Sequence, residues 1–237
     1  MSAFANVRAR QLEPEIMDQP GLDSTRHAEA LRGLSRINLL SGTCSALWTP
    51  LKRWTLQHPG VPLRVLDVAS GGGEIAIGLR HRAARMNLPI TVDGCDRNQT
   101  AVAYALNAAR SNRVDANFYT HDVIQNGIPE GYDAITCALF MHHLTDEEAR
   151  GFLRHAADTC KLIVISDLIR SRGGLALAHL ACRALTRSEV VHNDGPSSVA
   201  AAFTIEEFRR LATDAGLHGH RISWQWPFRF LFTWCRS

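Results

Sequence analysis

The amino-acid sequence predicts an α/β fold: a doubly wound, mostly parallel sheet of seven strands that ends in an antiparallel hairpin, preceded by an N-terminal helical cap. From residue 63 onward, apolar runs of strand length alternate with segments of helical periodicity, which is typical of parallel strands joined by right-handed helical crossovers. Near the C-terminus, two apolar runs are joined by little more than residues 225–227. So short a connection permits only a hairpin, and the last two strands should therefore be antiparallel.

Length and composition indicate an ordinary globular protein. The chain has 237 residues, enough for one sizeable core, and 46% of them are hydrophobic and 21% charged. Its net charge of +3 comes with scattered arginines, which predicts no nucleic-acid partner. The first 15 residues lack the apolar core of a signal peptide, and the longest apolar stretch, residues 175–185, is too short to span a bilayer. Six cysteines without a CxxC pair suit a reducing cytoplasm, where we expect the protein to be.

Residues 1–60 are expected to form an N-terminal tail and a helical cap or lid. Residues 1–20 are polar and interrupted by prolines, so no fixed structure is predicted for them. Asp23 or Ser24 can cap a first amphipathic helix. A second amphipathic helix is predicted over 44–57, and prolines and a glycine follow it.

Strands and helices alternate over residues 61–237, which we predict to be the main domain. Strands are predicted at 63–69, 90–96, 116–123, 132–141, 161–169, 217–224 and 227–234. Helices are predicted at 74–87, 100–110, 145–160 and 204–215, the last two opened by Thr-x-x-Glu capping boxes. The connection at about 170–203 is too long for an ordinary loop. We expect a helical insertion there, whose central, almost wholly apolar helix is covered by the cap, by a second subunit or by an apolar ligand.

The stretch VLDVASGGGEIA, residues 65–76, places three glycines between the first strand and the helix that follows. In open α/β sheets this turn meets the ligand, because helix N-terminal amides attract anions and glycines let a ligand lie against the backbone. A tight turn without a ligand is the structural alternative. Glu74 replaces the third glycine of a dinucleotide-binding loop, and no Gly-Lys-Ser/Thr of a P-loop follows. The sequence therefore argues against both of these nucleotide-binding loops.

Three acids stand at the ends of the first three predicted strands: Asp67 before the glycine loop, then Asp96 and Asp122. In this order they resemble the class I S-adenosylmethionine-dependent methyltransferases, over about residues 64–234. The family's loop is usually acid-x-G-x-G-x-G, and Ala69 stands here in place of the first glycine. The resemblance implies a Rossmann-like methyltransferase fold with a variable helical cap over the substrate, and S-adenosylmethionine as the cofactor.

The resemblance also implies which residues bind the cofactor. Asp67 would orient the methionine amino group, Asp96 would accept hydrogen bonds from both ribose hydroxyls, and Asp122 would accept one from the adenine amino group. Val123 would supply a backbone N–H to adenine, and Leu139 would lie near the transferred methyl group. The predicted set is Asp67, Ala69, Ser70, Gly71, Gly73, Asp96, Arg97, Asp122, Val123 and Leu139. As an alternative, Asp96 and Asp122 are solvated or helix-capping acids.

The segment after the fourth predicted strand, ALFMHHL, bears on the methyl acceptor. It lacks the Asn/Asp-Pro-Pro-Tyr/Phe sequence of methylases that act on base amines or glutamine amides. It resembles instead the small-molecule branch, which includes quinone-biosynthesis C-methyltransferases and natural-product O-methyltransferases. His142 or His143 could deprotonate the acceptor, and as chain neighbours only one of them is expected to face the pocket. Both could instead be structural.

Further substrate contacts are expected from the cap and the insertion. Trp48 lies on the apolar side of the second predicted helix, and His179 and His192 lie in the insertion. No metal is predicted, because the HxxxH and HExxH ligand spacings are absent.

The predicted function is S-adenosylmethionine-dependent methyl transfer, in secondary metabolism, to a small and partly apolar acceptor of phenolic, quinone-like or polyketide type. Both O- and C-methylation stay open at this point. The alternatives are a non-catalytic S-adenosylmethionine-binding or regulatory module, and an RNA or protein methyltransferase. The expected partners are the small-molecule substrate and a second copy of this chain, which would form a homodimer.

Overall fold

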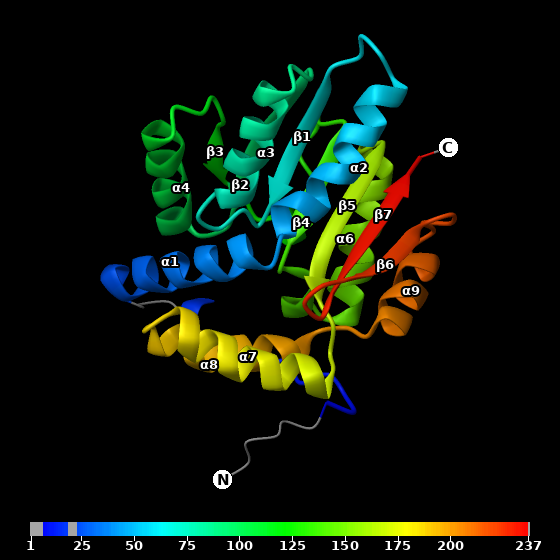
Figure 1. The fold of residues 1–237 in the computed structure, drawn as a ribbon. Helices are drawn as coiled ribbons and strands as arrows, with labels where there is room; N and C mark the ends of the chain where they lie inside the picture. Colours follow the sequence, from blue (N-terminus) through cyan, green and yellow to red (C-terminus); the bar gives the residue numbers. More distant parts are fainter. Residues whose placement is uncertain (1–6, 19–22, 237) are drawn as a thin grey trace.

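A single seven-stranded sheet runs through the described part of the chain, residues 7–18 and 23–236 of a computed structural model (Figure 1). The strands follow the order β3-β2-β1-β4-β5-β7-β6; the first five are parallel, and β7 pairs antiparallel with both β5 and β6. Their bounds are β1 Leu63–Val68, β2 Ile90–Asp96, β3 Phe118–Thr120, β4 Ala134–Ala138, β5 Leu162–Leu168, β6 Arg221–Gln225 and β7 Arg229–Cys235. The predicted fold class is confirmed.

Helices cover both faces of the sheet, because the central strands are apolar on both sides (Figure 1). On one face lie α2 (Thr43–Gln57), α3 (Glu74–Arg85) and α4 (Gln99–Ser111). On the other lie α5 (Val123–Asn126), α6 (Asp146–Thr159) and α9 (Ile205–Asp214). Both predicted capping boxes are present: Thr145 and Glu148 open α6, and Thr204 and Glu207 open α9. None of the helices in the described residues is long and apolar enough to cross a membrane.

A third helical layer, the cap, lies beyond the carboxyl ends of the parallel strands (Figure 1). It consists of α1 (Ser24–Leu40), α7 (Arg172–Leu185) and α8 (Glu189–Ala201), which pack against one another. Two short 3-10 helices, η1 (Ile16–Asp18) and η2 (Met141–His143), lie against α8. The cap therefore closes the edge of the sheet at which ligands bind in open α/β folds.

Two details of the predicted cap differ in the structure. Helix α2 packs on the sheet, where Trp48 is buried with α3 and β1, so Trp48 does not contact the cavity as expected. The amphipathic pattern of α2 predicted a buried face but could not indicate which layer buries it. The insertion forms two helices instead of one central helix, and Leu180 on α7 is 70% exposed, so α7 is not covered on all sides.

Residues 7–18, here called the strap, are held firmly against the cap. The Arg10 guanidinium bonds Asp146 at 2.6 Å and the Leu144 carbonyl at 2.7 Å, and it lies 3.6 Å from the centre of the Phe203 ring. At the other end, the buried Asp194 carboxylate accepts the backbone N–H groups of Ile16 and Met17, both at 3.0 Å. The prediction of no fixed structure is wrong for this segment; residues 1–6 and 19–20, which it also covered, lie outside the described residues.

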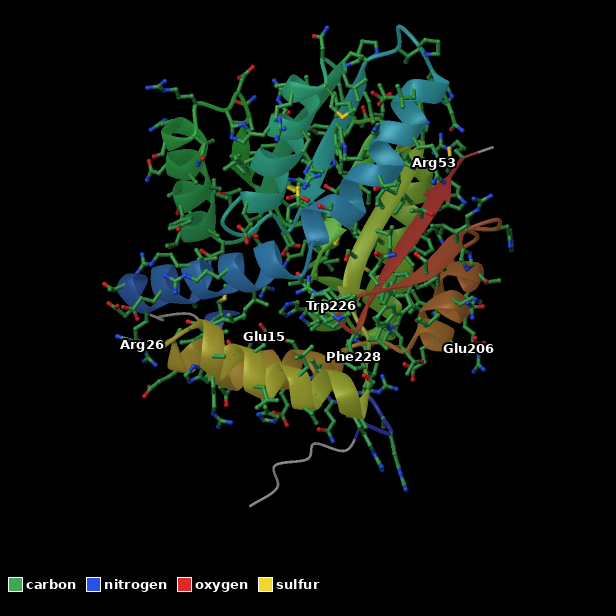
Figure 2. The ribbon with its side chains drawn as sticks, in the orientation of Figure 1. Glu15, Arg26, Arg53, Glu206, Trp226 and Phe228 are labelled. Atoms are coloured by element: carbon green, nitrogen blue, oxygen red, sulfur yellow. The ribbon has the colours of Figure 1, made fainter. Side chains whose placement is uncertain are left out.

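The strap brings one acid into the interior. Figure 2 shows Glu15 between the sheet and the α7–α8 layer, whereas Arg26, Arg53 and Glu206 lie on the outside. Because both ends of the strap are anchored, the position of Glu15 is fixed by tertiary contacts and not by local secondary structure.

Candidate active site

One large cavity of about 1040 Å³ lies between the strand ends and the cap. This volume is at the upper end of the roughly 300–1,000 Å³ that small-molecule sites occupy. Its wall runs from the glycine loop, past the acids that follow β2 and β3, to the two histidines of η2 and the apolar faces of α7 and α8. A cofactor and a second small molecule can therefore occupy the same cavity.

The glycine loop has two kinds of glycine. At Gly71, where φ is +50°, an added Cβ would meet nothing closer than 4.0 Å, so the backbone lies open to the cavity. At Gly73, where φ is +79°, an added Cβ would lie 2.8 Å from the Phe118 ring. Gly73 therefore packs the loop against the sheet and is not part of the cavity wall, where it was predicted to lie. Ala69 has φ +51°, a left-handed conformation that explains why glycine is usual at this position.

Asp67 lies at the cavity wall beneath the glycine loop and is almost completely buried. The Thr136 hydroxyl donates to its Oδ1 at 2.7 Å. Burial raises the pKa of the Asp67 carboxyl to about 7, although the hydrogen bond from Thr136 lowers it, and the nearby carboxylates of Glu74 and Asp96 raise it further. A positive group bound beside Asp67 would stabilise the ionised form.

Asp96 joins the end of β2 to the glycine loop. Its Oδ2 accepts the Gly71 N–H at 2.9 Å, and its Oδ1 accepts the Asn98 N–H at 2.8 Å. Asn98, not Asp96, caps α4, so the alternative capping role does not apply to this acid. The exposed Arg97 also lines the cavity.

Asp122 both caps a helix and lines the cavity, the two roles that the sequence allows for it. Its Oδ1 caps α5 by accepting the Ile124 N–H at 2.9 Å and the Gln125 N–H at 3.2 Å. Asp122 and the buried Val123 also line the cavity, on the same side as Asp96. The predicted third strand is shorter than expected because this cap starts a helix at residue 123.

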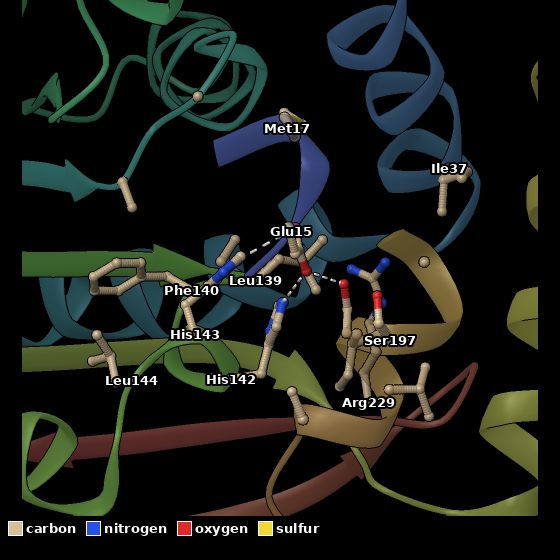
Figure 3. A pocket seen from close by; sticks show the side chains of 18 of the residues that line it. Glu15, Met17, Ile37, Leu139, Phe140, His142, His143, Leu144, Ser197 and Arg229 are labelled. Carbon is tan, nitrogen blue, oxygen red and sulfur yellow. Dashed lines mark hydrogen bonds and ion pairs between the residues drawn. The ribbon is translucent and has the colours of Figure 1, made fainter. Parts of the chain in front are cut away.

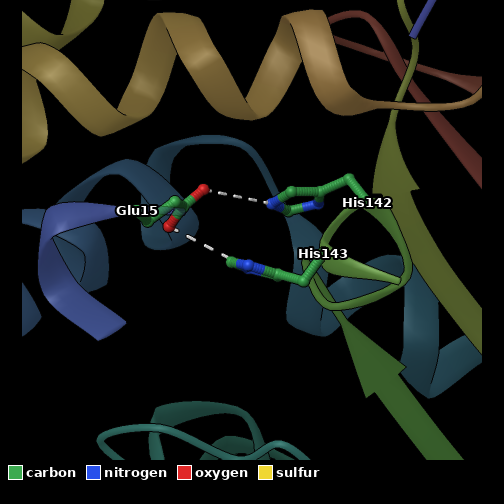
Figure 4. Close-up of side chains that lie close together, drawn as sticks. All are labelled: Glu15, His142 and His143. Carbon is green, nitrogen blue, oxygen red and sulfur yellow. Dashed lines mark ion pairs between the residues drawn. The ribbon is translucent and has the colours of Figure 1, made fainter. Parts of the chain in front are cut away.

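Two histidines and an acid meet at the far end of the cavity (Figures 3 and 4). His142 Nε2 lies 3.7 Å from Glu15 Oε1, and His143 Nε2 lies 4.0 Å from Glu15 Oε2. On its other side, His142 Nδ1 bonds the buried Asp167 carboxylate at 2.7 Å. The expectation that only one histidine faces the pocket is wrong, because both side chains of this 3-10 turn converge on Glu15.

The three ligand atoms of Glu15, His142 and His143 lie within 4.8 Å of one another, and this is the one group in the described residues placed to hold a metal ion. Burial alone lowers the pKa of His142, but the carboxylates of Asp167 and Glu15 raise it to about 10. Burial raises the pKa of Asp167, but the charge of His142 and the hydrogen bonds from His142 and the Leu168 N–H together lower it below its usual value. His142 is therefore cationic at neutral pH, which is unfavourable for the predicted role of a base.

Backbone strain marks the point where the cofactor and acceptor ends meet. Leu139, which directly follows β4, lines the cavity and has φ +55°, a conformation that is uncommon for a residue with a side chain. Figure 3 shows Leu139 beside Glu15 and the two histidines. That Leu139 lies near the transferred methyl group stays a prediction.

The structure does not bring the predicted substrate residues to the cavity. Trp48 is buried in the core beneath α2, and neither His179 nor His192 is part of the cavity wall. His192 Nε2 bonds the Thr186 carbonyl at 2.9 Å instead. Amphipathic and polar positions in helices can serve packing or capping, and sequence spacing does not separate these uses.

Sequence reasoning missed residues that the structure places at the site. Glu15 and Arg229 line the cavity. Asp167 forms a hydrogen bond with His142, and Thr136 forms one with Asp67, so these two residues orient side chains of the cavity wall. Asp167 is the next-to-last residue of β5, so the strand-end rule that found Asp67 and Asp96 could have found it. Glu15 carries no such signal, since it lies in an irregular segment far from the histidines in sequence.

Comparison with known proteins agrees with this geometry. Residues 65–162 match the family described as "Methyltransferase domain". A demethylmenaquinone methyltransferase from Thermus thermophilus is 30% identical over 121 residues, which are 50% of this chain and 53% of the relative. The chain thus spans about half the length of this curated relative.

Solved structures extend the likeness over almost the whole fold. Magnesium protoporphyrin IX methyltransferase from Synechocystis PCC 6803, solved with S-adenosylhomocysteine, has a TM-score of 0.58 at 18% identity and covers 93% of this chain and 91% of its own. The plantazolicin methyltransferase BpumL was solved in complex with a desmethylplantazolicin analogue and S-adenosylhomocysteine. It has a TM-score of 0.65 at 16% identity, and the match covers 90% of this chain and 96% of BpumL. The resemblance predicted from the strand-end acids is confirmed: residues 65–162 match a methyltransferase-domain family, and the chain has the fold of solved S-adenosylmethionine-dependent methyltransferases.

Proposed function

We propose that this protein transfers a methyl group from S-adenosylmethionine to a small, partly apolar acceptor that carries a phenolic or similar ring hydroxyl. The observation that carries the proposal is the single cavity, which joins Asp67, Asp96 and Asp122 at one end to Glu15, His142 and His143 at the other. A methyl transfer needs donor and acceptor in line at close distance, and one continuous cavity allows that arrangement.

The residues at the first end suit the cofactor. Each oxygen of a carboxylate can accept two hydrogen bonds, so Asp96 can bind both ribose hydroxyls while it keeps its bonds to Gly71 and Asn98. Asp122 and Val123 would bind adenine, and the buried Asp67 would bind the methionine ammonium. The Ser70 hydroxyl is buried at the cavity wall with no partner among the described residues, and a bound polar group would give it one. S-Adenosylmethionine supplies an electrophilic methyl group on a sulfonium.

The residues at the second end suit a hydroxylated ring. Leu177, Ala178 and Leu185 of α7 supply apolar surface, while Glu15 and His143 supply polar groups where a hydroxyl can bind and lose its proton. The oxygen, or a ring carbon activated by its ionisation, then bonds the methyl carbon as the carbon–sulfur bond breaks, leaving a neutral thioether. Both O- and C-methylation need the hydroxyl proton removed at this end of the cavity, and C-methylation also needs the proton of the attacked ring carbon to leave, so that the ring becomes aromatic again and the oxygen regains a proton.

The names of the similar proteins support a small-molecule acceptor. The acceptors named for them are demethylmenaquinone, magnesium protoporphyrin IX and plantazolicin. A non-catalytic binding module is less well supported, because it would not need a cluster of Glu15, His142 and His143 beside the cofactor site. A homodimer and a cytoplasmic location stay predictions.

Calorimetry followed by a turnover assay tests the proposal. We expect S-adenosylmethionine and S-adenosylhomocysteine to bind one per chain, and a panel of phenols and hydroxyquinones to include compounds that release S-adenosylhomocysteine. Mass spectrometry and NMR of the product would separate O- from C-methylation. Cofactor binding without turnover on any member of the panel would favour the binding module.

Replacing Asp96 with Ala should weaken S-adenosylmethionine binding by about 1–3 kcal/mol, roughly 5- to 150-fold, because two ribose hydrogen bonds are lost. Calorimetry measures this change. Asp93→Ala is the matched control, since Asp93 lies on the same strand but outside the cavity wall and bonds Asn117 instead. Equal affinities for the Asp96 variant and the unchanged protein would remove Asp96 from the cofactor site.

Cofactor affinity should fall as the pH drops below about 7, where Asp67 of the free protein takes up a proton. A bound ammonium group favours the ionised carboxylate, so the pKa of Asp67 is lower in the complex. Binding is therefore strongest above the pKa of the free protein and weakens by up to about tenfold per pH unit below it. Calorimetry between about pH 5.5 and about pH 8 checks this, with Asp67→Asn expected to remove the dependence. An affinity of the unchanged protein that stays constant over this range would contradict the role of Asp67.

A further inference from the structure

We propose that Glu15, His142 and His143 form a binding site for one divalent transition-metal ion, at the acceptor end of the cavity. The sequence predicted no metal, because the HxxxH and HExxH ligand spacings are absent. Glu15 lies more than a hundred residues before the two histidines in the chain. The fold places all three side chains together, with the Nε2 atoms of both histidines facing the same carboxylate (Figure 4).

The distances suit one ion. The two histidine nitrogens lie 3.7 Å and 4.0 Å from the Glu15 oxygens, and the three ligand atoms all lie within 4.8 Å of one another. Two ligands of one ion lie about 3–4 Å apart at metal–ligand bond lengths of roughly 2.0–2.2 Å. Small side-chain rotations therefore bring the three ligands to bonding distance without a change in the backbone.

The donor set is selective. Two imidazoles and one carboxylate form the facial arrangement that binds ions such as Fe²⁺, Zn²⁺ or Co²⁺ and leaves coordination positions open. Mg²⁺ and Ca²⁺ prefer sites made of oxygen atoms, so they are poorer candidates. The open positions would face the cavity, because all three residues belong to its wall.

The surroundings are those of a supported metal site. His142 Nδ1 bonds Asp167 at 2.7 Å, which orients the ring and directs Nε2 toward Glu15. Metal-binding histidines commonly give their other N–H to a carboxylate in this way. The buried Ser198 hydroxyl bonds Glu15 Oε1 and holds the carboxylate in place. Glu15 and Asp167 together carry two negative charges around the histidines, and a divalent ion that displaces the proton of His142 would supply the positive charge that balances them.

A bound ion would give this end of the cavity a defined chemistry. A hydroxyl that coordinates an ion loses its proton more easily, and the proton is then released to water. The ionised oxygen, or the ring carbon it activates, attacks the methyl carbon as described above. This consequence rests on the proposed function, whereas binding of the ion does not.

Binding of Zn²⁺ and Co²⁺ to the full chain, freed of metal by a chelator and without cofactor or acceptor, tests the site. We expect one ion per chain by calorimetry, and a visible absorption spectrum when Co²⁺ binds. Glu15→Gln and His143→Gln should weaken binding by more than about 100-fold, and Asp167→Asn by about 10- to 100-fold, because it acts only through His142. His192→Gln, at a histidine outside the cavity, should leave binding unchanged.

Two outcomes would overturn the metal site. One is the absence of one-to-one binding to the unchanged protein, and the other is equal binding by the unchanged protein and the Glu15 and His143 variants. Circular dichroism shows whether each variant folds. Calorimetry with S-adenosylmethionine on the same samples tests the proposed function separately, so that either idea can fail without the other.

Discussion

Replacing Glu15 with Gln should lower turnover by about 10²- to 10⁴-fold, the loss usual when a group that assists proton removal is disabled. Glu15 is the one acid that both histidines of η2 face, so its carboxylate serves the whole acceptor end of the cavity. Glutamine keeps the shape and the hydrogen bond with Ser198 but removes the charge. S-Adenosylmethionine affinity should not change, because Asp67, Asp96 and Asp122 lie at the other end of the cavity.

The comparison that decides this prediction uses Glu29→Gln. Glu29 is an exposed acid on α1, in the same N-terminal part of the chain, and it is not part of the cavity wall. Its replacement should leave turnover unchanged, so that a general effect of losing one negative charge is excluded. Full turnover by the Glu15 variant on a hydroxylated ring that the unchanged protein methylates would show that the Glu15 carboxylate is not needed for methyl transfer.

The two ends of the cavity differ in how well the sequence predicts them. The cofactor end follows local rules: a strand ends, an acid or a glycine follows, and parallel strands bring these ends to one edge. The order of Asp67, Asp96 and Asp122 at strand ends, with the family resemblance that this order carries, predicted one common site, and all three line the same cavity. Asp167 obeys the same rule near the end of β5, but it is absent from the predicted site.

The acceptor end depends on contacts between distant segments. Glu15 reaches His142 because Arg10 is anchored near η2 and Asp194 holds the backbone at Ile16. These contacts join residues more than a hundred positions apart, and no periodicity in residues 7–18 predicts them. Trp48 shows the reverse error, because its helical pattern was correct but the layer that buries it was not.

Replacing Gly73 with Ala should lower the free energy of unfolding by about 2–4 kcal/mol. The backbone at Gly73 has φ +79°, which costs a residue with a Cβ roughly 1–2 kcal/mol. The new methyl group would also lie 2.8 Å from the Phe118 ring and 2.9 Å from Ala105, and such overpacking costs about 1–3 kcal/mol. The lower chain entropy of the unfolded alanine variant returns about 0.4–1 kcal/mol. Urea unfolding followed by circular dichroism measures the difference.

Gly151→Ala is the matched control, and it should raise the free energy of unfolding instead of lowering it. Gly151 lies in the middle of α6, exposed, and an added Cβ there meets nothing within 4 Å. Alanine in a helix should then stabilise the protein by about 1 kcal/mol. The two variants carry the same chemical change, so a large difference between them can come only from the glycine loop and its contact with Phe118. If Gly73→Ala unfolded at the urea concentration of the unchanged protein, the loop would not be packed against β3 as the structure has it, and the cofactor end of the cavity would lose its fixed shape.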